Sequence, residues 1–163
     1  MNIFFLDENP RLAAQYHCDK HLNKMILEGA QFICNAFHAF DLEPPYRKTH
    51  FNHPCSVWVR ESWQNVCWLF DLMYQLNEER KERFGITKNH RSFEVIDELL
   101  TKYCFEISSI MKNDKLTKFP KVVAQDLKEK IENPVECYRE YYRRDKKHLH
   151  KWTKRNKPWW IDS

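Results

Sequence analysis

The sequence predicts a mainly α protein: a compact single-domain helical bundle of about four to five helices with an extended N-terminal segment. The chain has 163 residues, enough for one domain with a real core. Two glycines against seven prolines are too few for a turn-rich all-β fold or a glycine-rich phosphate loop. Charged residues make up 31% and hydrophobic residues 42%, which is typical of a folded chain. We therefore treat residues 1–163 as one domain.

The N-terminal third predicts an anchored segment followed by one long helix. The apolar run 3–6 fits a strand or an extended piece, because its length does not discriminate, and we favour the extended piece. Asn9 and Pro10 form a strong helix start. The apolar periodicity then predicts a helix from residue 10 to about 40, which Pro44 and Pro45 stop. Gly29 lies on its apolar face and is expected to permit close approach of another backbone.

The remaining elements follow from similar start and stop signals. Pro54 opens a helix that the apolar pattern carries to residue 84, with Gly85 as its stop. A third helix runs from 92 to about 113, and 125–131 is at best a short one. Asn133 and Pro134 begin a basic helix and tail, 134–163. The Trp159-Trp160 pair near the end is costly to leave in water, so it should dock on the domain or on a ligand.

A polar stripe on the first helix draws attention. With a period of 3.6 residues, His17, His21, Lys24 and Glu28 share one side of the helix, separate from its apolar side. Two imidazoles, an ammonium and a carboxylate on one stripe are typical of an active site. Together with Asp19 in the same segment, they are our candidate catalytic residues.

The two histidines of the stripe also allow a metal site. His17 and His21 have the i, i+4 spacing with which two imidazoles bind one metal from a helix. Further ligands would come from His50, His53 or Glu28, and a divalent metal such as Zn would be the cofactor. Lys24 on the same stripe would repel a cation, and we therefore favour a hydrogen-bonded histidine cluster without metal.

Lys24 and Glu28 have two interpretations. As an exposed i, i+4 pair they would stabilise the helix by only a few tenths of a kcal/mol. As partly desolvated groups they would serve as nucleophile and general acid–base. We favour the catalytic interpretation because of the stripe in which they lie.

Two polar turns could form the rim of a binding pocket. The segments 46–53 and 88–91 combine cations, histidines and aromatic residues, which suit phosphate contacts and base stacking. The alternative is that each turn has no binding role and only leads into the following helix. The candidate nucleic-acid-binding residues here are Lys48, His50, Asn52, His53, Lys88, His90 and Arg91. Cys55, at the start of the second helix, could serve as a nucleophile, but six dispersed cysteines favour an ordinary packed thiol.

Positive charge is concentrated at the C-terminus. The formal net charge is only +4, yet the segment 138–157 is dense in arginine and lysine, with Tyr and Trp among them. This pattern favours binding to a polyanion, and we expect nucleic acid, in particular DNA, before a membrane surface; a solvated basic helix is the alternative. The candidate contacts are Arg143, Arg144, Lys151, Trp152, Lys154 and Arg155.

The cysteines indicate a reducing compartment. Six cysteines lie far apart without a Cys-x-x-Cys pair or a preceding signal peptide. We expect reduced thiols and a cytoplasmic protein, inside a host cell if it is viral. No apolar run approaches the length of a membrane span, and the oligomeric state is open.

Several short motifs resemble a family of small uncharacterised proteins common in phage and viral genomes. They are Asn2-Ile3-Phe4, Cys18-Asp19-Lys20-His21, Lys24-Met25, Glu28, Thr49-His50, Asn52-His53-Pro54, Tyr138-Arg139, Tyr141-Tyr142 and Lys151-Trp152. The resemblance spans nearly the whole chain but implies no established activity.

In layout the chain is also similar to pyrimidine dimer DNA glycosylases, which are compact, basic, helical single domains. That resemblance implies that Glu28 corresponds to their catalytic carboxylate. Those enzymes use the α-amine exposed after removal of the initiator methionine. Here Asn2 is a large second residue, so Met1 is expected to stay, and Lys24 or Lys20 would have to replace the α-amine.

The sequence thus predicts a nucleic-acid-processing enzyme that acts on a base or its glycosidic bond. Lys24 would be the nucleophile or electrostatic catalyst and Glu28 the general acid–base, while His17 and His21 would orient substrate or shuttle protons. A metal-dependent nucleotide or phosphodiester hydrolase is one alternative. A non-enzymatic adaptor that binds nucleic acid or a host factor is another.

Overall fold

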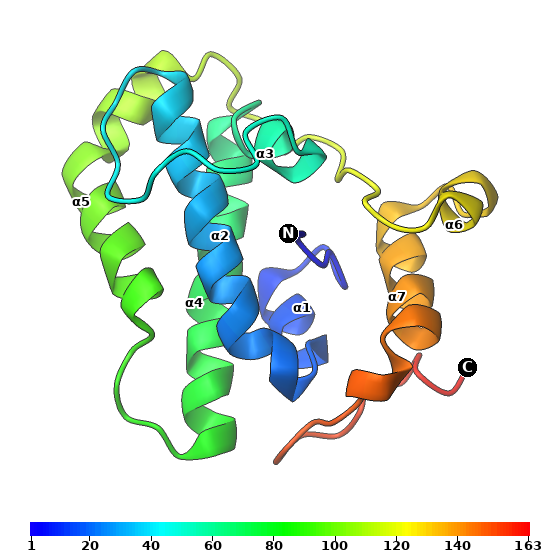
Figure 1. Cartoon of the computed structure of the whole chain (residues 1–163). Coiled ribbons are helices and arrows are strands. Elements are labelled where there is room, and N and C mark those ends of the chain that lie inside the picture. The colour runs from blue at the N-terminus through cyan, green and yellow to red at the C-terminus, as the bar shows by residue number, and fades with distance from the viewer.

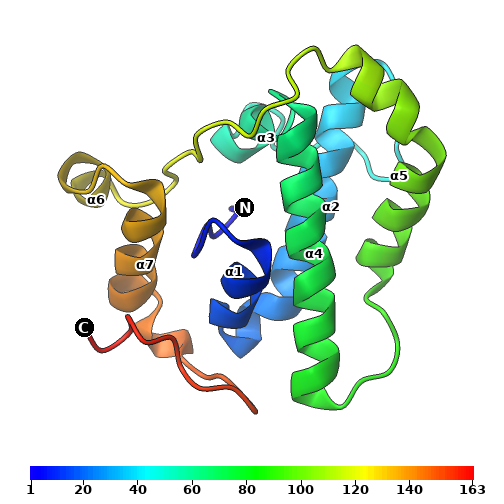
Figure 2. The same cartoon turned by 180° about the vertical axis from the view of Figure 1, so that it is seen from behind.

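The computed structural model describes residues 1–163 and contains helices but no strands. Helices α2 (Asp19–Ala39) and α4 (Trp63–Phe84) lie side by side, with α5 (Arg91–Ile110) packed against both (Figure 1). Seen from either side, the N-terminal segment and α1 (Pro10–Tyr16) lie between this layer and α7 (Pro134–Asp145) (Figure 2). The predicted all-helical single-domain fold is confirmed. None of the helices combines the length and the apolarity that crossing a bilayer requires.

The single long helix predicted for residues 10–40 is wrong: the structure has two helices, α1 and α2. His17 and Cys18 are extended between them, with ψ of 134° and 160°. Arg83 of α4 reaches this junction and donates to the carbonyls of Gln15, at 2.9 Å, and His17, at 2.8 Å. The guanidinium thus satisfies carbonyl groups that the interrupted helix leaves without partners. A contact from 66 residues away stabilises the break.

The second predicted helix, 54–84, is also two helices. Here α3 (Pro54–Val59) ends before Ser62, whose side chain caps α4 by accepting a hydrogen bond from the backbone nitrogen of Asn65 at 3.0 Å. Gly85 ends α4 with a φ of 63°, as its stop signal predicts. These two breaks raise the count from the four to five helices predicted to seven α-helices.

The C-terminal half follows the predicted starts. Residues 125–131 contain the short helix α6 (Gln125–Lys130), and Asn133 caps α7 through its side chain. A single 3-10 turn, η1 (Lys147–Leu149), leads into the tail. The expected docking of the tryptophan pair is half right: Trp160 is buried, with 3% of its surface exposed, whereas Trp159 is 71% exposed.

The N-terminal segment is extended and buried, as predicted, and packs into an aromatic cluster. The ring of Phe5 lies 4.3 Å from that of Phe119 and 5.0 Å from that of Trp58. Gly29 does allow a close approach, but of a side chain and not of a backbone. A Cβ there would meet Met73 Cγ of α4 at 2.9 Å. This N-terminal segment, residues 1–6, therefore lies directly against the middle of α2.

Candidate active site

Glu28 is the buried carboxylate at the centre of the candidate site. Its side chain is 10% exposed, and Oε2 accepts a hydrogen bond of 2.9 Å from the backbone nitrogen of Asn2. Lys24, one turn earlier on α2, places its Nζ 3.7 Å from Glu28 Oε1 and is 62% exposed. The structure therefore combines a fixed, nearly buried carboxylate with an accessible amine, as the i, i+4 spacing predicts.

Asn2, whose backbone nitrogen donates to Glu28, is itself fixed in place by hydrogen bonds of its side chain. Its Nδ2 donates to the carbonyl of Val122 at 2.8 Å, and its Oδ1 accepts from the backbone nitrogen of Ile3 at 2.8 Å. The hydroxyl of Tyr138 donates to the same Oδ1 at 3.1 Å. Elements from both ends of the chain thus fix the position of Glu28 before any ligand binds.

The turn that precedes α3 adds His53 to the site. His53 caps α3 by accepting from the backbone nitrogen of Cys55 at 3.1 Å. Burial lowers the pKa of His53, and the positive N-terminal amino group and His50 lower it further, while Glu28 acts in the opposite direction. His53 therefore begins α3, as the interpretation of this turn as a helix entry expects, and its charge is also influenced by Glu28. Cys55 is a packed thiol whose pKa burial raises to about 12.

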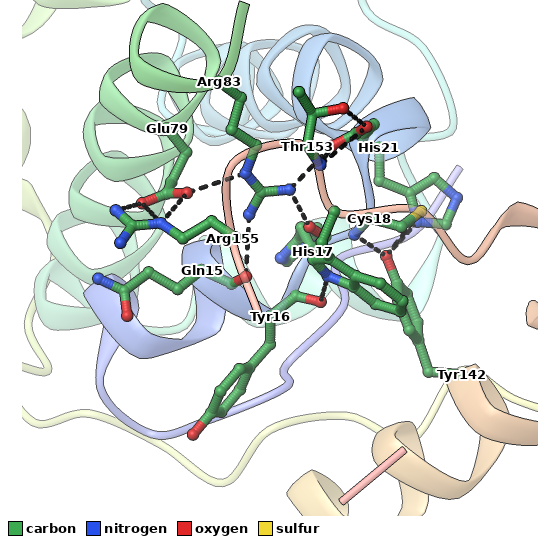
Figure 3. Close-up of polar contacts among 12 residues, drawn as sticks. Gln15, Tyr16, His17, Cys18, His21, Glu79, Arg83, Tyr142, Thr153 and Arg155 are labelled. Carbon is green, nitrogen blue, oxygen red and sulfur yellow. Dashed lines mark hydrogen bonds and ion pairs between the residues drawn. The ribbon is translucent and has the colours of Figure 1, made fainter. Parts of the chain in front are cut away.

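His17 and His21 are not part of this cluster. His17 ends α1, so the polar stripe predicted from a continuous helix does not include it. Its Nδ1 donates to the carbonyl of Ala13 at 2.7 Å, while its buried Nε2 has no partner. His21 stacks on Phe4 at 4.6 Å, and its Nδ1 lies 2.6 Å from the hydroxyl of Tyr142. Figure 3 shows Tyr142 reaching both His21 and Cys18.

Both buried imidazoles are held neutral. Burial lowers the pKa of His17 to about 4, and Arg83 adds to the effect. Burial also lowers the pKa of His21 to about 3, with the positive charges of His17 and Lys24 contributing. No group of three or more His, Cys, Asp or Glu side chains is arranged to hold a metal ion. The alternative ligand set of His17, His21, His50 and His53 is therefore not assembled.

Asp19 anchors the C-terminal tail at the junction of α1 and α2. Its Oδ2 accepts from the hydroxyl of Thr153 at 2.7 Å, and its Oδ1 accepts from the backbone nitrogen of Thr153 at 3.0 Å and from Arg83 at 3.2 Å. Figure 3 shows Arg83 between this junction and Glu79, which Arg155 contacts from the tail. The contacts of Asp19 are structural and lie apart from Glu28.

The arginines of the C-terminal block are mostly engaged within the chain. Arg143 pairs with Glu140, Arg144 with Asp126 and Asp145, and Arg155 with Glu79. Trp152 is half-buried and donates through Nε1 to the carbonyl of Tyr16 at 3.0 Å. These residues were predicted to contact nucleic acid, and the structure gives each of them a partner inside the protein.

Four lysines of α2 and the C-terminal region differ from these arginines, because most of them have no carboxylate partner within the chain. Lys20, Lys24, Lys146 and Lys151, here called the lysine surface, are exposed or half-buried. Only Lys24 has a carboxylate partner, Glu28. Lys20 and Lys151 line a hollow of about 500 Å3 together with His148. The charges of Lys24 and Lys146 both act on His21. Lys154, also in the predicted set, is exposed and contacts only the carbonyl of Glu82, at 3.5 Å.

The two polar turns have separate places. In the first, Lys48 Nζ and Arg60 Cζ lie 4.5 and 3.9 Å from the ring centroid of Phe51, and Asn52 is exposed. In the second, His90 caps α5. Arg91 pairs with Glu94, and the carbonyl of Lys88 accepts from Arg80 at 2.8 Å. Because Arg80 also donates to Asn23 of α2, at 2.7 Å, the second turn lies beside the first half of α2.

Two residues that position Glu28 were missed at the sequence level. Asn2 and Tyr138 are joined by a hydrogen bond that spans 136 residues, and no local pattern reveals it. No protein-family model, curated protein or solved structure matches the chain.

Proposed function

We propose that the protein is a DNA glycosylase with lyase activity, in which Lys24 is the nucleophile and Glu28 the general acid–base. The observation that supports this most is the pairing of an accessible amine with a buried carboxylate that lies 3.7 Å away and is hydrogen-bonded to Asn2. An ion pair needed only for helix stability would gain little from burying one partner and hydrogen-bonding it to Asn2. An amine that attacks a sugar carbon needs such a proton acceptor beside it.

The chemistry can be followed atom by atom. After Lys24 gives its ammonium proton to solvent, the neutral Nζ attacks C1′ of the damaged nucleotide. The bond from C1′ to the base nitrogen breaks, and the base leaves with the electron pair and takes a proton from solvent. Glu28 then accepts a proton from the attached nitrogen and transfers it to O4′ as the C1′–O4′ bond opens. The product is a protonated imine between Lys24 and the open sugar.

The lysine surface supports DNA as the substrate. Lys20 and Lys24 follow one another on the exposed side of α2, and Lys146 and Lys151 approach from the C-terminal region. Ammonium groups without carboxylate partners are free to contact phosphates, which position a duplex without reading its sequence. Burial lowers the pKa of His53, which favours its neutral form, and Glu28 acts on it in the opposite direction. We assign it to substrate orientation.

The test is product analysis on defined oligonucleotides. Duplexes carrying a pyrimidine dimer, a uracil or an abasic site are incubated with the protein in the presence of EDTA. The proposal expects strand cleavage at the abasic site and base release from at least one damaged duplex. If none of these substrates is converted, with or without added divalent metal, while the protein still binds DNA, the protein is a binding adaptor and the enzymatic proposal fails.

A further inference from the structure

A second hollow lies on α2 next to Glu28. It has a volume of about 550 Å3 and is formed between the exposed side of α2 and the loop that leads to α3. Its lining residues are Leu27, Gln31, Pro45, Tyr46, Arg47 and Thr49. None of them has a part in the chemistry above, so the hollow is available for another purpose.

The loop over this hollow is firmly attached to the helices. Asn35, fully buried on α2, donates to the carbonyl of Thr49 at 2.6 Å. His38 donates through Nε2 to the carbonyl of Tyr46 at 2.9 Å, and the hydroxyl of Tyr46 donates to Ser92 of α5 at 3.0 Å. Because these contacts exist without a ligand, the hollow is formed in advance and binding has little ordering entropy to overcome.

The chemistry of the lining suits a nucleobase. Leu27, Pro45 and the half-buried ring of Tyr46 offer apolar and aromatic surface for the face of a heterocycle. The side-chain amide of Gln31 makes no hydrogen bond within the chain, and it carries the adjacent donor and acceptor that pair with the edge of a base. Arg47 is exposed, has no carboxylate partner and matches a phosphate.

The position of the hollow connects it to the candidate active site. Leu27 precedes Glu28 by one residue and Gln31 follows it by three, so that Gln31 lies about 4.5 Å further along the helix axis. Lys24 and Gln31 point to nearly the same side of α2, since seven residues are close to two turns. A base in the hollow would therefore bring its sugar towards Lys24 and Glu28.

We propose that this hollow binds a single unstacked nucleobase of the DNA substrate, with Gln31 on its edge and Arg47 on a neighbouring phosphate. The inference rests on the proposed function and deepens it, because an enzyme that acts on a base must remove it from the stack and hold it. The hollow determines which base is accepted, whereas the lysine surface binds the backbone without discrimination.

The test compares two single-stranded oligonucleotides that differ at one position, one with 2-aminopurine and one with an abasic analogue that resists cleavage. Wild-type protein should bind the first at least tenfold more tightly, and the 2-aminopurine fluorescence should change on binding. Gln31→Ala and Leu27→Trp, the second of which fills the hollow, should each lose most of this preference. Gln64→Ala and Leu12→Trp are matched controls at exposed helix positions and should keep it. Equal affinity of the wild type for both oligonucleotides, or an unchanged preference in both variants, would overturn the inference.

The result is separable from the proposed function. A base preference that depends on Gln31, in a protein that converts no damaged DNA, would retain the hollow as a nucleobase site and reject the glycosylase. Conversion of damaged DNA without any base preference would reject the hollow and retain the enzyme.

Discussion

The carboxylate of Glu28 accepts a hydrogen bond from the backbone nitrogen of Asn2, 26 residues earlier in the chain. Asn2 is held in turn by Tyr138, whose hydroxyl also accepts a hydrogen bond from the backbone nitrogen of Val122 at 3.1 Å. The geometry of the candidate site therefore depends on α7, although no residue of α7 belongs to the catalytic pair.

Tyr138→Phe tests this dependence. The substitution keeps the ring but leaves the backbone nitrogen of Val122 without its partner, so the free energy of unfolding should fall by about 1–3 kcal/mol. Turnover should fall as well, because Asn2 no longer holds Glu28 in one place. Tyr141→Phe is the control, since the hydroxyl of Tyr141 makes no hydrogen bond within the chain and its ring is half-buried. Equal stability of the two variants in urea would contradict this view of the site.

Arg83 should be among the most important residues for stability. Its side chain is inaccessible to solvent, pairs with Asp19 and Glu79, and satisfies two carbonyls at the break between α1 and α2. Arg83→Met leaves both acids without this partner and should cost about 3–5 kcal/mol in urea denaturation. By comparison, Arg91→Met breaks an exposed pair with Glu94 and should cost less than about 1 kcal/mol. A small effect at Arg83 would show that the junction is stable without it.

Stability should decrease in weak acid because of the buried histidines. The folded-state pKa of His17 is about 4 and that of His21 about 3, both below the usual 6.5. The unfolded chain therefore binds protons more readily, so the stabilisation is complete above pH 6.5 and is lost as the pH falls towards these lower values.

The urea midpoint should accordingly fall steadily between about pH 6.5 and pH 4. His17→Phe should flatten this decline, because it removes a fully buried imidazole that takes up a proton more readily in the unfolded chain than in the folded one. His148→Phe replaces an exposed imidazole whose charge contributes least to the lowered pKa of His21, and should change the curve far less than His17→Phe. The same decline in wild type and His17→Phe would exclude His17 as its cause.

The salt dependence of DNA binding should depend on the lysine surface and not on the paired arginines. Lys20→Gln and Lys151→Gln should each reduce the slope of log K against log salt by about 0.9, because each removes one phosphate contact. Arg144→Gln should leave the slope unchanged, since Arg144 already pairs with Asp126 and Asp145. Fluorescence anisotropy at several salt concentrations measures all three. A larger loss for Arg144 than for the lysines would restore the C-terminal block as the binding surface.

The sequence predicted those features that depend on local chemistry. The caps at Asn9, Asn133 and Gly85 use only neighbouring residues, and all three occur as expected. The proximity of Lys24 and Glu28 follows from helical spacing alone. The break after Tyr16 could not be predicted, because an arginine of another helix stabilises it.

The same limit explains the errors at the site. The polar stripe assumed a continuous helix, and once the helix is interrupted at His17 the two histidines turn towards Tyr142 and Phe4. The basic block was read from residue types alone, whereas the acids that neutralise its arginines include Asp126 and Glu79, outside the block. Charge in a sequence does not reveal which cations remain free in the fold.

Covalent trapping with borohydride tests the central claim most directly. The protein is incubated with abasic or damaged duplex DNA and borohydride, which reduces an imine to a stable secondary amine, and the adduct is mapped by peptide mass spectrometry. We predict an adduct on Lys24, abolished in Lys24→Gln, and formed far more slowly in Glu28→Gln although DNA binding is retained. An adduct on the α-amino group or on Lys20 would move the nucleophile away from Lys24. No adduct on any of these substrates, with Lys24→Gln and Glu28→Gln folded and unchanged in every activity, would contradict the account and leave the pair as a structural contact.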